Sequence, residues 1–301
     1  MKTNQSNQNI YQQITDRVIA AIEAGASKFE MPWHKGPNQR RPKNVATGNS
    51  YRGINTVSLW VAQLEHDYSS NLWGTYNQWK ACGAQVRKGE HAAPVVFFKG
   101  FEQPENQTEE TKPNFSFIAT TSWVFNADQV HGWNASNPTP TTDKIRVFEE
   151  AESFIAATKA NIKEVGTCAC YKRFQDTIYV PSWQLFRGSH TSSATESYYS
   201  ILLHELTHWT GHQSRVNREL NNRFGESGYA MEELVAELGA AFLCADLNIS
   251  LEPRADHAAY IAIWLRVLKN DKRAIFTAAS KASEAVDYLN KLQPHLLEHA
   301  A

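Results

Sequence analysis

The stretch SYYSILLHELTHWTGH, Ser197 to His212, places three histidines and one glutamate in an apolar run. Directly before it, SATE (residues 193–196) has the form of a helix-capping box, in which the first and last side chains bond to each other's backbone N–H groups. Leucines at three- and four-residue spacings then predict one buried helix face. His204 and His208 are four residues apart, so both imidazoles lie on one face of that helix and are close enough to share one ion.

The pentapeptide HELTH, residues 204–208, has the HExxH arrangement that is typical of zinc hydrolases. Two histidines hold the metal, and the glutamate between them, here Glu205, takes a proton from water. A catalytic zinc needs a third protein ligand. His212 cannot supply it, because it lies about 12 Å along the helix from His204. The metzincin pattern fails as well, since Ser214 stands where its last histidine would be.

A second stretch, MEELVAELGAAFL (residues 231–243), supplies the missing ligand. Glu233 and Glu237 are four residues apart on a mostly apolar helix, where carboxylates require cationic partners. We assign Glu233 to the metal and Glu237 to the orientation of a ligand histidine, with the reverse order as an open alternative. Glu232 is expected to face solvent. The expected cofactor is Zn²⁺, with another divalent ion such as Mn²⁺ as the alternative.

The chemistry that this ligand set predicts is peptide hydrolysis, with Glu205 as the general base. A tyrosine or histidine that stabilises the oxyanion is also expected. Tyr229, just before the glutamate-bearing helix, is the candidate.

The composition is that of a globular protein: 301 residues, 42% hydrophobic, with a net charge of -1. No run of 18 uncharged apolar residues occurs, and the N-terminal segment is polar before an amphipathic helix, so we expect neither a membrane span nor a secretory signal. The expected location is the cytoplasm. The four cysteines lack the spacing of a zinc ribbon and are expected to be reduced.

The order of patterns predicts an α+β protein of two domains. An α+β N-terminal domain, residues 1–130, is expected to begin with a helix over Tyr11–Ala24 and to contain strands at APVVFFKG and FSFIATTSWVFN. Residues 131–145, rich in Pro, Thr and Asn, are expected to be a linker. Residues 146–301 are expected to form a mostly helical domain with a small sheet.

The segment from Lys28 to Lys99 contains ten basic and four acidic side chains, interleaved with aromatic residues. Cations that pair with phosphates, together with flat rings that stack on bases, are how proteins hold single-stranded nucleic acid. Trp60, Phe97 and Phe98 are expected in the core. The candidate DNA-binding residues are Trp33, Arg40, Arg41, Lys43, Tyr51, Arg52, Trp73, Tyr76, Arg87 and Lys88.

Taken together, five stretches resemble antirestriction proteins of the ArdC type: PWHKGPNQRRPKNVATGNSYRGINTVSLW, TYNQWKACGAQVRKGE, VFNADQV, YYSILLHELTHWTGH and YAMEELVAELGAAFL. The likeness covers most of the chain in the same order. It implies a protein carried on conjugative plasmids, with an N-terminal domain that binds single-stranded DNA and a C-terminal zincin-like metallopeptidase domain. By resemblance, His204, Glu205 and His208 take the zincin roles, and host restriction-system proteins are candidate substrates.

Two other functions fit the same motifs. The chain could be a cytosolic zinc metallopeptidase whose first domain recognises protein substrates, or a DNA-binding protein whose metal site is not catalytic. Steeply salt-dependent binding to single-stranded DNA would argue against the first of these. Glu205 argues against the second, because a structural metal site gains nothing from a proton-accepting carboxylate at that position.

Overall fold

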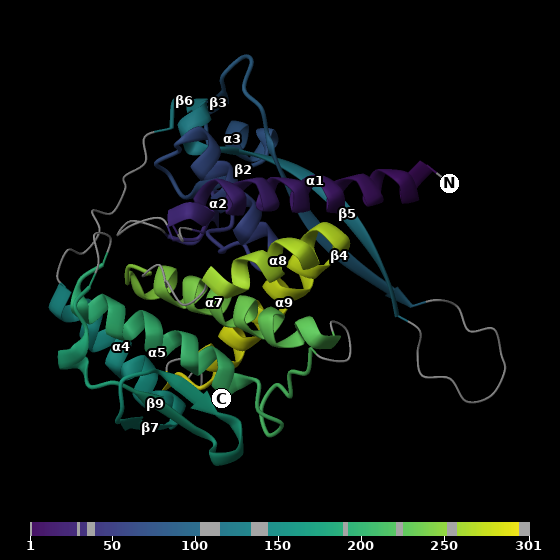
Figure 1. Ribbon diagram of the computed structural model, residues 1–301. Coiled ribbons are helices and arrows are strands. Elements are labelled where there is room, and N and C mark those ends of the chain that lie inside the picture. Colours follow the sequence, from purple (N-terminus) through teal and green to yellow (C-terminus); the bar gives the residue numbers. More distant parts are fainter. Residues whose placement is uncertain are drawn as a thin grey trace.

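The computed structural model describes residues 2–28, 31–34, 40–102, 115–133, 144–188, 192–220, 225–251 and 258–294. It confirms the α+β class, with a sheet-containing N-terminal region and a helical C-terminal region that has a small sheet of its own (Figure 1). The predicted linker falls mostly on residues 134–143, which lie outside the described residues. No helix in the described part of the chain is both long enough and apolar enough to cross a membrane.

Among its described residues, the N-terminal region has three α-helices and six strands. Its helices are α1 (Lys2–Gly25), α2 (Ile54–His66) and α3 (Tyr76–Ala81). Its strands are β1 (Lys43–Asn44), β2 (Leu72–Gly74), β3 (Gln85–Val86), β4 (Ala93–Glu102), β5 (Phe115–Asn126) and β6 (Val130–His131). Helix α1 begins before the expected Tyr11, because residues 2–10 contain no proline or glycine that would end it.

The main N-terminal sheet has the strand order β1-β2-β5-β4. Strand β5 has the bounds that its sequence predicted, whereas β4 continues past the predicted Gly100 to Glu102. The two strands pair antiparallel from Ala93 opposite Val124 to Glu102 opposite Phe115. Figure 1 shows this ribbon extending away from the body of the molecule. Strands β3 and β6 form a separate antiparallel pair.

The C-terminal region contains helices α4 (Lys144–Thr158), α5 (Ala194–Thr210), α7 (Gly228–Leu247), α8 (Ala258–Asn270) and α9 (Ala274–Lys291). Strands β7 (Asn161–Glu164), β8 (Cys170–Lys172) and β9 (Thr177–Val180) form a small sheet in the order β7-β9-β8. Helix α7 packs against α5, α8 and α9 and is buried along most of its length. The helix that carries both glutamates is therefore central to this region.

One hydrophobic core joins the two regions. Ile14 and Trp60 from the N-terminal half lie in the same buried cluster as Leu206, Val235 and Ala279 from the C-terminal half. Polar contacts cross the same boundary: Thr15 Oγ1 donates to the Lys272 carbonyl at 2.8 Å, and the Gly53 N–H donates to Ser283 Oγ at 2.9 Å. The two halves are packed as one body.

Candidate metal centre

Helix α5 begins with the capping box that the sequence predicted. The Glu196 N–H donates to Ser193 Oγ at 3.3 Å, and the Ser193 N–H donates to Glu196 Oε2 at 2.9 Å. These reciprocal bonds satisfy backbone donors at the start of the helix. The helix then continues without a break to Thr210, which places His204 and His208 one turn apart.

Glycine at position 239 lets α5 and α7 approach closely. A Cβ atom at Gly239 would lie 2.5 Å from Thr207 Cγ2 and 2.7 Å from Thr207 Oγ1. Both distances are shorter than van der Waals contact, so any larger residue would force the helices apart. The close approach brings the histidine face of α5 against the glutamate face of α7.

His204, His208 and Glu233 meet where the two helices face each other. His204 Nε2 and His208 Nε2 are 3.2 Å apart. Glu233 Oε2 lies 3.4 Å from His204 Nε2, and Glu233 Oε1 lies 3.5 Å from His208 Nε2. All three side chains offer ligand atoms within 4.8 Å of one another. Ligand atoms held about 2.1 Å from one tetrahedral ion are about 3.4 Å apart. The spacing and the donor set therefore fit a divalent metal ion.

Glu237 lies outside this cluster and faces the other ring nitrogen of His204. Its Oε2 is 3.6 Å from His204 Nδ1, and its side chain is 1% exposed. The structure thus brings Glu233 to the ligand atoms and places Glu237 behind His204, and the roles assigned to the two carboxylates stay a prediction.

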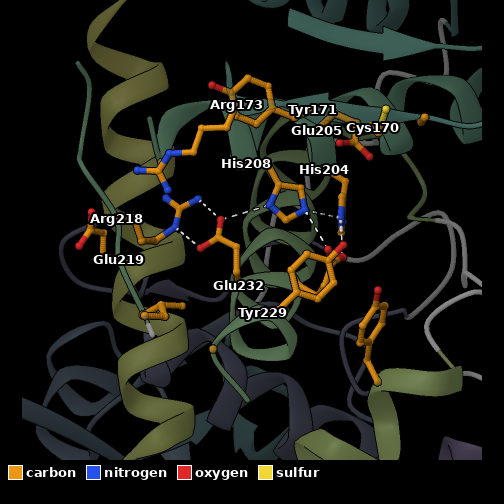
Figure 2. A pocket seen from close by; sticks show the side chains of 16 residues that line it. Cys170, Tyr171, Arg173, His204, Glu205, His208, Arg218, Glu219, Tyr229 and Glu232 are labelled. Atoms are coloured by element: carbon orange, nitrogen blue, oxygen red, sulfur yellow. Dashed lines mark hydrogen bonds and ion pairs between the residues drawn. The ribbon is translucent and has the colours of Figure 1, made fainter. Parts of the chain in front are cut away.

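Glu232 corrects an expectation, because its side chain is only 24% exposed and is paired with residues of the site. Its Oε1 lies 3.1 Å from His208 Nδ1. Arg218 donates to the same carboxylate from Nε at 2.8 Å and from NH2 at 2.6 Å. Figure 2 shows this chain of contacts running from Arg218 through Glu232 to His208. No pattern in the sequence pointed to Arg218, which lies between α5 and α7, and helical spacing alone could not show that Glu232 has a partner.

The electrostatics of the site favour charged carboxylates. Burial by itself would lower the pKa of His208, but hydrogen bonds with Glu232 and Glu233 raise it to about 10. Burial would raise the pKa of Glu232, but the charge and hydrogen bonds of Arg218 lower it to about 2. The pKa of Glu233 is also lowered, because hydrogen bonds with His204 and His208 outweigh burial. A metal ion that binds these atoms must displace the proton of His208.

The metal-binding atoms border a cavity of about 650 Å³. Glu205 lines this cavity and is 4% exposed, next to the ligand His204 in the chain. Figure 2 shows Glu205 beside Cys170 and Tyr171, which come from the edge strand β8. The cavity can therefore admit a substrate to a carboxylate and to the metal ligands together.

Tyr229 also lines the cavity, and it is 63% exposed. Partial burial and a hydrogen bond with Tyr260 raise the pKa of its phenol, so the hydroxyl keeps its proton. Its place at the mouth of the pocket is compatible with the predicted oxyanion role, which stays a prediction.

The candidate DNA-binding residues divide into buried and exposed groups. Three predicted stacking rings are in the core: Trp33, Tyr51 and Trp73 are 1%, 7% and 0% exposed. They cannot present a ring face to a base in this structure, and sequence reasoning missed this because their packing partners are distant in the chain. The reverse error concerns Phe97 and Phe98, which are 51% and 49% exposed and not in the core, whereas Trp60 is buried as expected.

The predicted cations divide in the same way. Arg41 is buried and pairs with Asp246 at 3.1 Å, and Arg52 pairs with Asp287. Arg87 pairs with Glu90 at 2.6 Å. The exposed or half-exposed residues that remain from the predicted set are Arg40, Lys43, Arg52, Tyr76, Arg87 and Lys88, of which Arg52 and Arg87 are ion-paired.

Comparisons with known proteins identify both halves of the chain. Residues 8–125 match the N-terminal domain of anti-restriction factor ArdC, and residues 149–281 match a zincin-like metallopeptidase domain. A protein designated y4eC from Sinorhizobium fredii is 42% identical over 298 residues, covering 97% of this chain and 95% of the relative. A DNA primase TraC from Escherichia coli is 34% identical over 299 residues, covering 93% of this chain but only 27% of that longer protein.

Solved structures agree with this assignment. The metal-free antirestriction protein ArdC from plasmid R388 superposes with a TM-score of 0.76 at 39% identity, covering 95% of this chain and 98% of that one. Its Mn(II)-bound structure superposes with a TM-score of 0.70 at 37% identity, covering 94% and 98%. The chain therefore belongs to the ArdC family of antirestriction proteins, with an ArdC N-terminal domain followed by a zincin-like metallopeptidase domain.

Proposed function

We propose that this protein protects incoming plasmid DNA from host restriction during conjugation, by binding single-stranded DNA and by hydrolysing peptide bonds at a zinc centre. The observation that carries the enzymatic part is the convergence of His204, His208 and Glu233 beside Glu205 in one cavity. A divalent ion held there would supply Lewis-acid polarisation of a peptide carbonyl and of water. Zn²⁺ suits this donor set, and Mn²⁺ is the alternative because it occupies the R388 relative.

The residues of the chain supply the remaining chemistry. Glu205 accepts a proton from the attacking water and passes it to the leaving amine. Glu232, fixed by Arg218, accepts a hydrogen bond from His208 Nδ1 and so leaves Nε2 free to act as a ligand. The hydroxyl of Tyr229 donates a hydrogen bond to the developing oxyanion. Host restriction subunits are the proposed substrates.

The DNA-binding part rests on the family of the N-terminal region and on its remaining exposed side chains. Lys43 and Lys88 are exposed cations, and Tyr76 is 46% exposed. Trp123, with Phe97 and Phe98, adds exposed rings on the β4–β5 ribbon that can stack on bases. Fluorescence anisotropy with a labelled single-stranded oligonucleotide over a salt series tests this proposal, because each phosphate contact steepens the fall of affinity with salt.

A variant with Lys43→Ala and Lys88→Ala should bind more weakly and with a shallower salt slope. Lys281→Ala is the matched control, since Lys281 lies on α9 in the C-terminal region and pairs with Glu284. Equal losses in both variants would contradict a specific role for the N-terminal cations. Incubation with purified restriction subunits, with and without the oligonucleotide, followed by a gel, tests proteolysis.

A further inference from the structure

A short turn of the N-terminal region, residues 31–34, reaches the metal centre of the C-terminal region. Trp33 and His34 are 1% and 6% exposed, and both contact Glu237 on α7. His34 Nε2 lies 2.5 Å from Glu237 Oε1, and Trp33 Nε1 donates to the same oxygen at 3.4 Å. His34 and Glu237 are 203 positions apart in the chain, so only the fold brings them together.

The turn itself determines how His34 meets Glu237. The backbone N–H of Met31 donates to His34 Nδ1 at 3.0 Å, and the backbone N–H of His34 donates to the Met31 carbonyl at 2.8 Å. A ring nitrogen that accepts a hydrogen bond carries no proton, so a neutral His34 has its proton on Nε2. His34 is therefore a donor aimed at the Glu237 carboxylate.

Glu237 also contacts the metal ligand His204 and so connects it to His34. Its second oxygen faces His204 Nδ1 at 3.6 Å, while Nε2 of the same ring belongs to the metal-binding cluster. A carboxylate behind a ligand histidine fixes the orientation of the ring and keeps the proton away from the ligand nitrogen. The side chains of His34, Glu237 and His204 are only 1–2% exposed, so water screens these contacts little.

The same part of the N-terminal region holds α7 at a second place. Arg41 pairs with Asp246 at 3.1 Å, and its guanidinium lies 4.8 Å from the centre of the Phe242 ring. Glu237, Phe242 and Asp246 are all on α7, which also carries the ligand Glu233. The N-terminal region thus contacts the ligand-bearing helix on either side of Phe242.

We propose that His34 is a positioning residue of the metal centre, through which the N-terminal region sets the metal affinity of the C-terminal site. The inference rests on the proposed metal site and extends it to a residue outside the two ligand-bearing helices. By thermodynamic linkage, a ligand of the N-terminal region that displaces this turn weakens metal binding, and bound metal weakens the binding of that ligand by the same factor.

Calorimetric titration of the full-length, metal-free protein with Mn²⁺ tests the proposal. His34→Leu removes the donor and should weaken Mn²⁺ binding about 10- to 100-fold. His34→Gln keeps an amide N–H near the position of Nε2 and should recover most of that loss. His66→Leu, at an exposed histidine of α2, is the matched control and should bind as the wild type does. Wild-type affinity in His34→Leu would overturn the proposal.

A double-mutant cycle with Glu237→Gln tests whether His34 acts through Glu237. If it does, adding His34→Leu to Glu237→Gln should change the Mn²⁺ affinity little, whereas additive losses would overturn the proposed path. The visible absorption spectrum of the Co²⁺-loaded protein gives a second readout, because its bands respond to the coordination of the ion. A shift in His34→Leu that is reversed in His34→Gln supports positioning, and unchanged bands oppose it.

These measurements require neither peptide hydrolysis nor DNA binding. A protein that binds metal as predicted but cleaves no restriction subunit would count against the proposed function alone. A protein that binds metal equally well with and without the His34 donor would count against this inference alone.

Discussion

Glu205 is the residue whose replacement separates metal binding from catalysis. Glu205→Gln preserves shape and hydrogen-bonding capacity but removes the base, while His204, His208 and Glu233 remain to hold the ion. General-base catalysis contributes roughly 10²- to 10⁴-fold in rate, so cleavage should nearly disappear while metal content and DNA affinity stay at wild-type levels. Cleavage assays beside elemental analysis check this expectation.

The same variant assigns the biological role in a conjugation assay into a restricting recipient. Protection that persists in Glu205→Gln would assign antirestriction to DNA binding by the N-terminal region. Protection that disappears would assign it to proteolysis. Retained cleavage, by contrast, would show that Glu205 is not the base.

Replacing Glu233, Glu237 or Glu232 should weaken metal binding to an extent that depends on where each glutamate lies in the site. Glu233→Ala should abolish stoichiometric metal, because it removes a ligand. Glu237→Ala and Glu232→Ala should each weaken metal binding about 10- to 100-fold, because Glu237 orients His204 and Glu232 orients His208. Glu219→Ala, at another residue that lines the cavity, is the control. A larger loss for Glu237→Ala than for Glu233→Ala would reverse the assignment of the two carboxylates.

Residue-level prediction from the sequence worked where the partners lie close in the chain. His204, Glu205 and His208 share two turns of one helix, so their spacing indicated their geometry. Glu233 could be inferred because a carboxylate on an apolar helix needs a partner. The roles of Glu232, Arg218 and His34 depend on contacts between distant segments, and no local pattern reveals them.

At the scale of elements, the contact between α5 and α7 forms the metal site, and Gly239 controls it. Gly239→Ala places a methyl group 2.5 Å from Thr207 Cγ2, so the helices must separate. We expect a loss of about 1–3 kcal/mol in the free energy of unfolding, together with weaker metal binding. Thermal unfolding and Mn²⁺ titration measure the two effects.

The matched test adds Thr207→Ala, which removes the two atoms nearest to the new methyl group. The double variant should regain part of both the stability and the metal affinity of the wild type. A double variant no better than Gly239→Ala alone would show that the helix contact is not the cause.

The strands and helices themselves were largely predictable from their periodicity. Strand β5 has the expected bounds, β4 continues past the expected Gly100 to Glu102, and α7 contains the whole stretch 231–243 that was expected to be helical. The exposure of Phe97 and Phe98 was not predictable. Their strand reads as apolar, but each of these side chains is about half exposed, with the Phe98 ring 6.4 Å from the Tyr11 ring between centroids.

For the whole molecule, the shared core predicts a single cooperative unfolding transition. Ile14 and Trp60 pack in one cluster with Leu206 and Val235, so neither half can bury all of its apolar surface alone. A fragment comprising residues 146–301 should therefore aggregate or bind hydrophobic dyes, and calorimetry of the full chain should show one transition. Two separate transitions, or a well-folded fragment, would contradict this expectation.

The shared core also bears on how such proteins diversify. Because side chains from both halves fill one interior, a crossover between diverged relatives in mid-chain would combine two sets of residues that had not adjusted to each other's volumes. Recombination that keeps the protein working must instead exchange the two halves together.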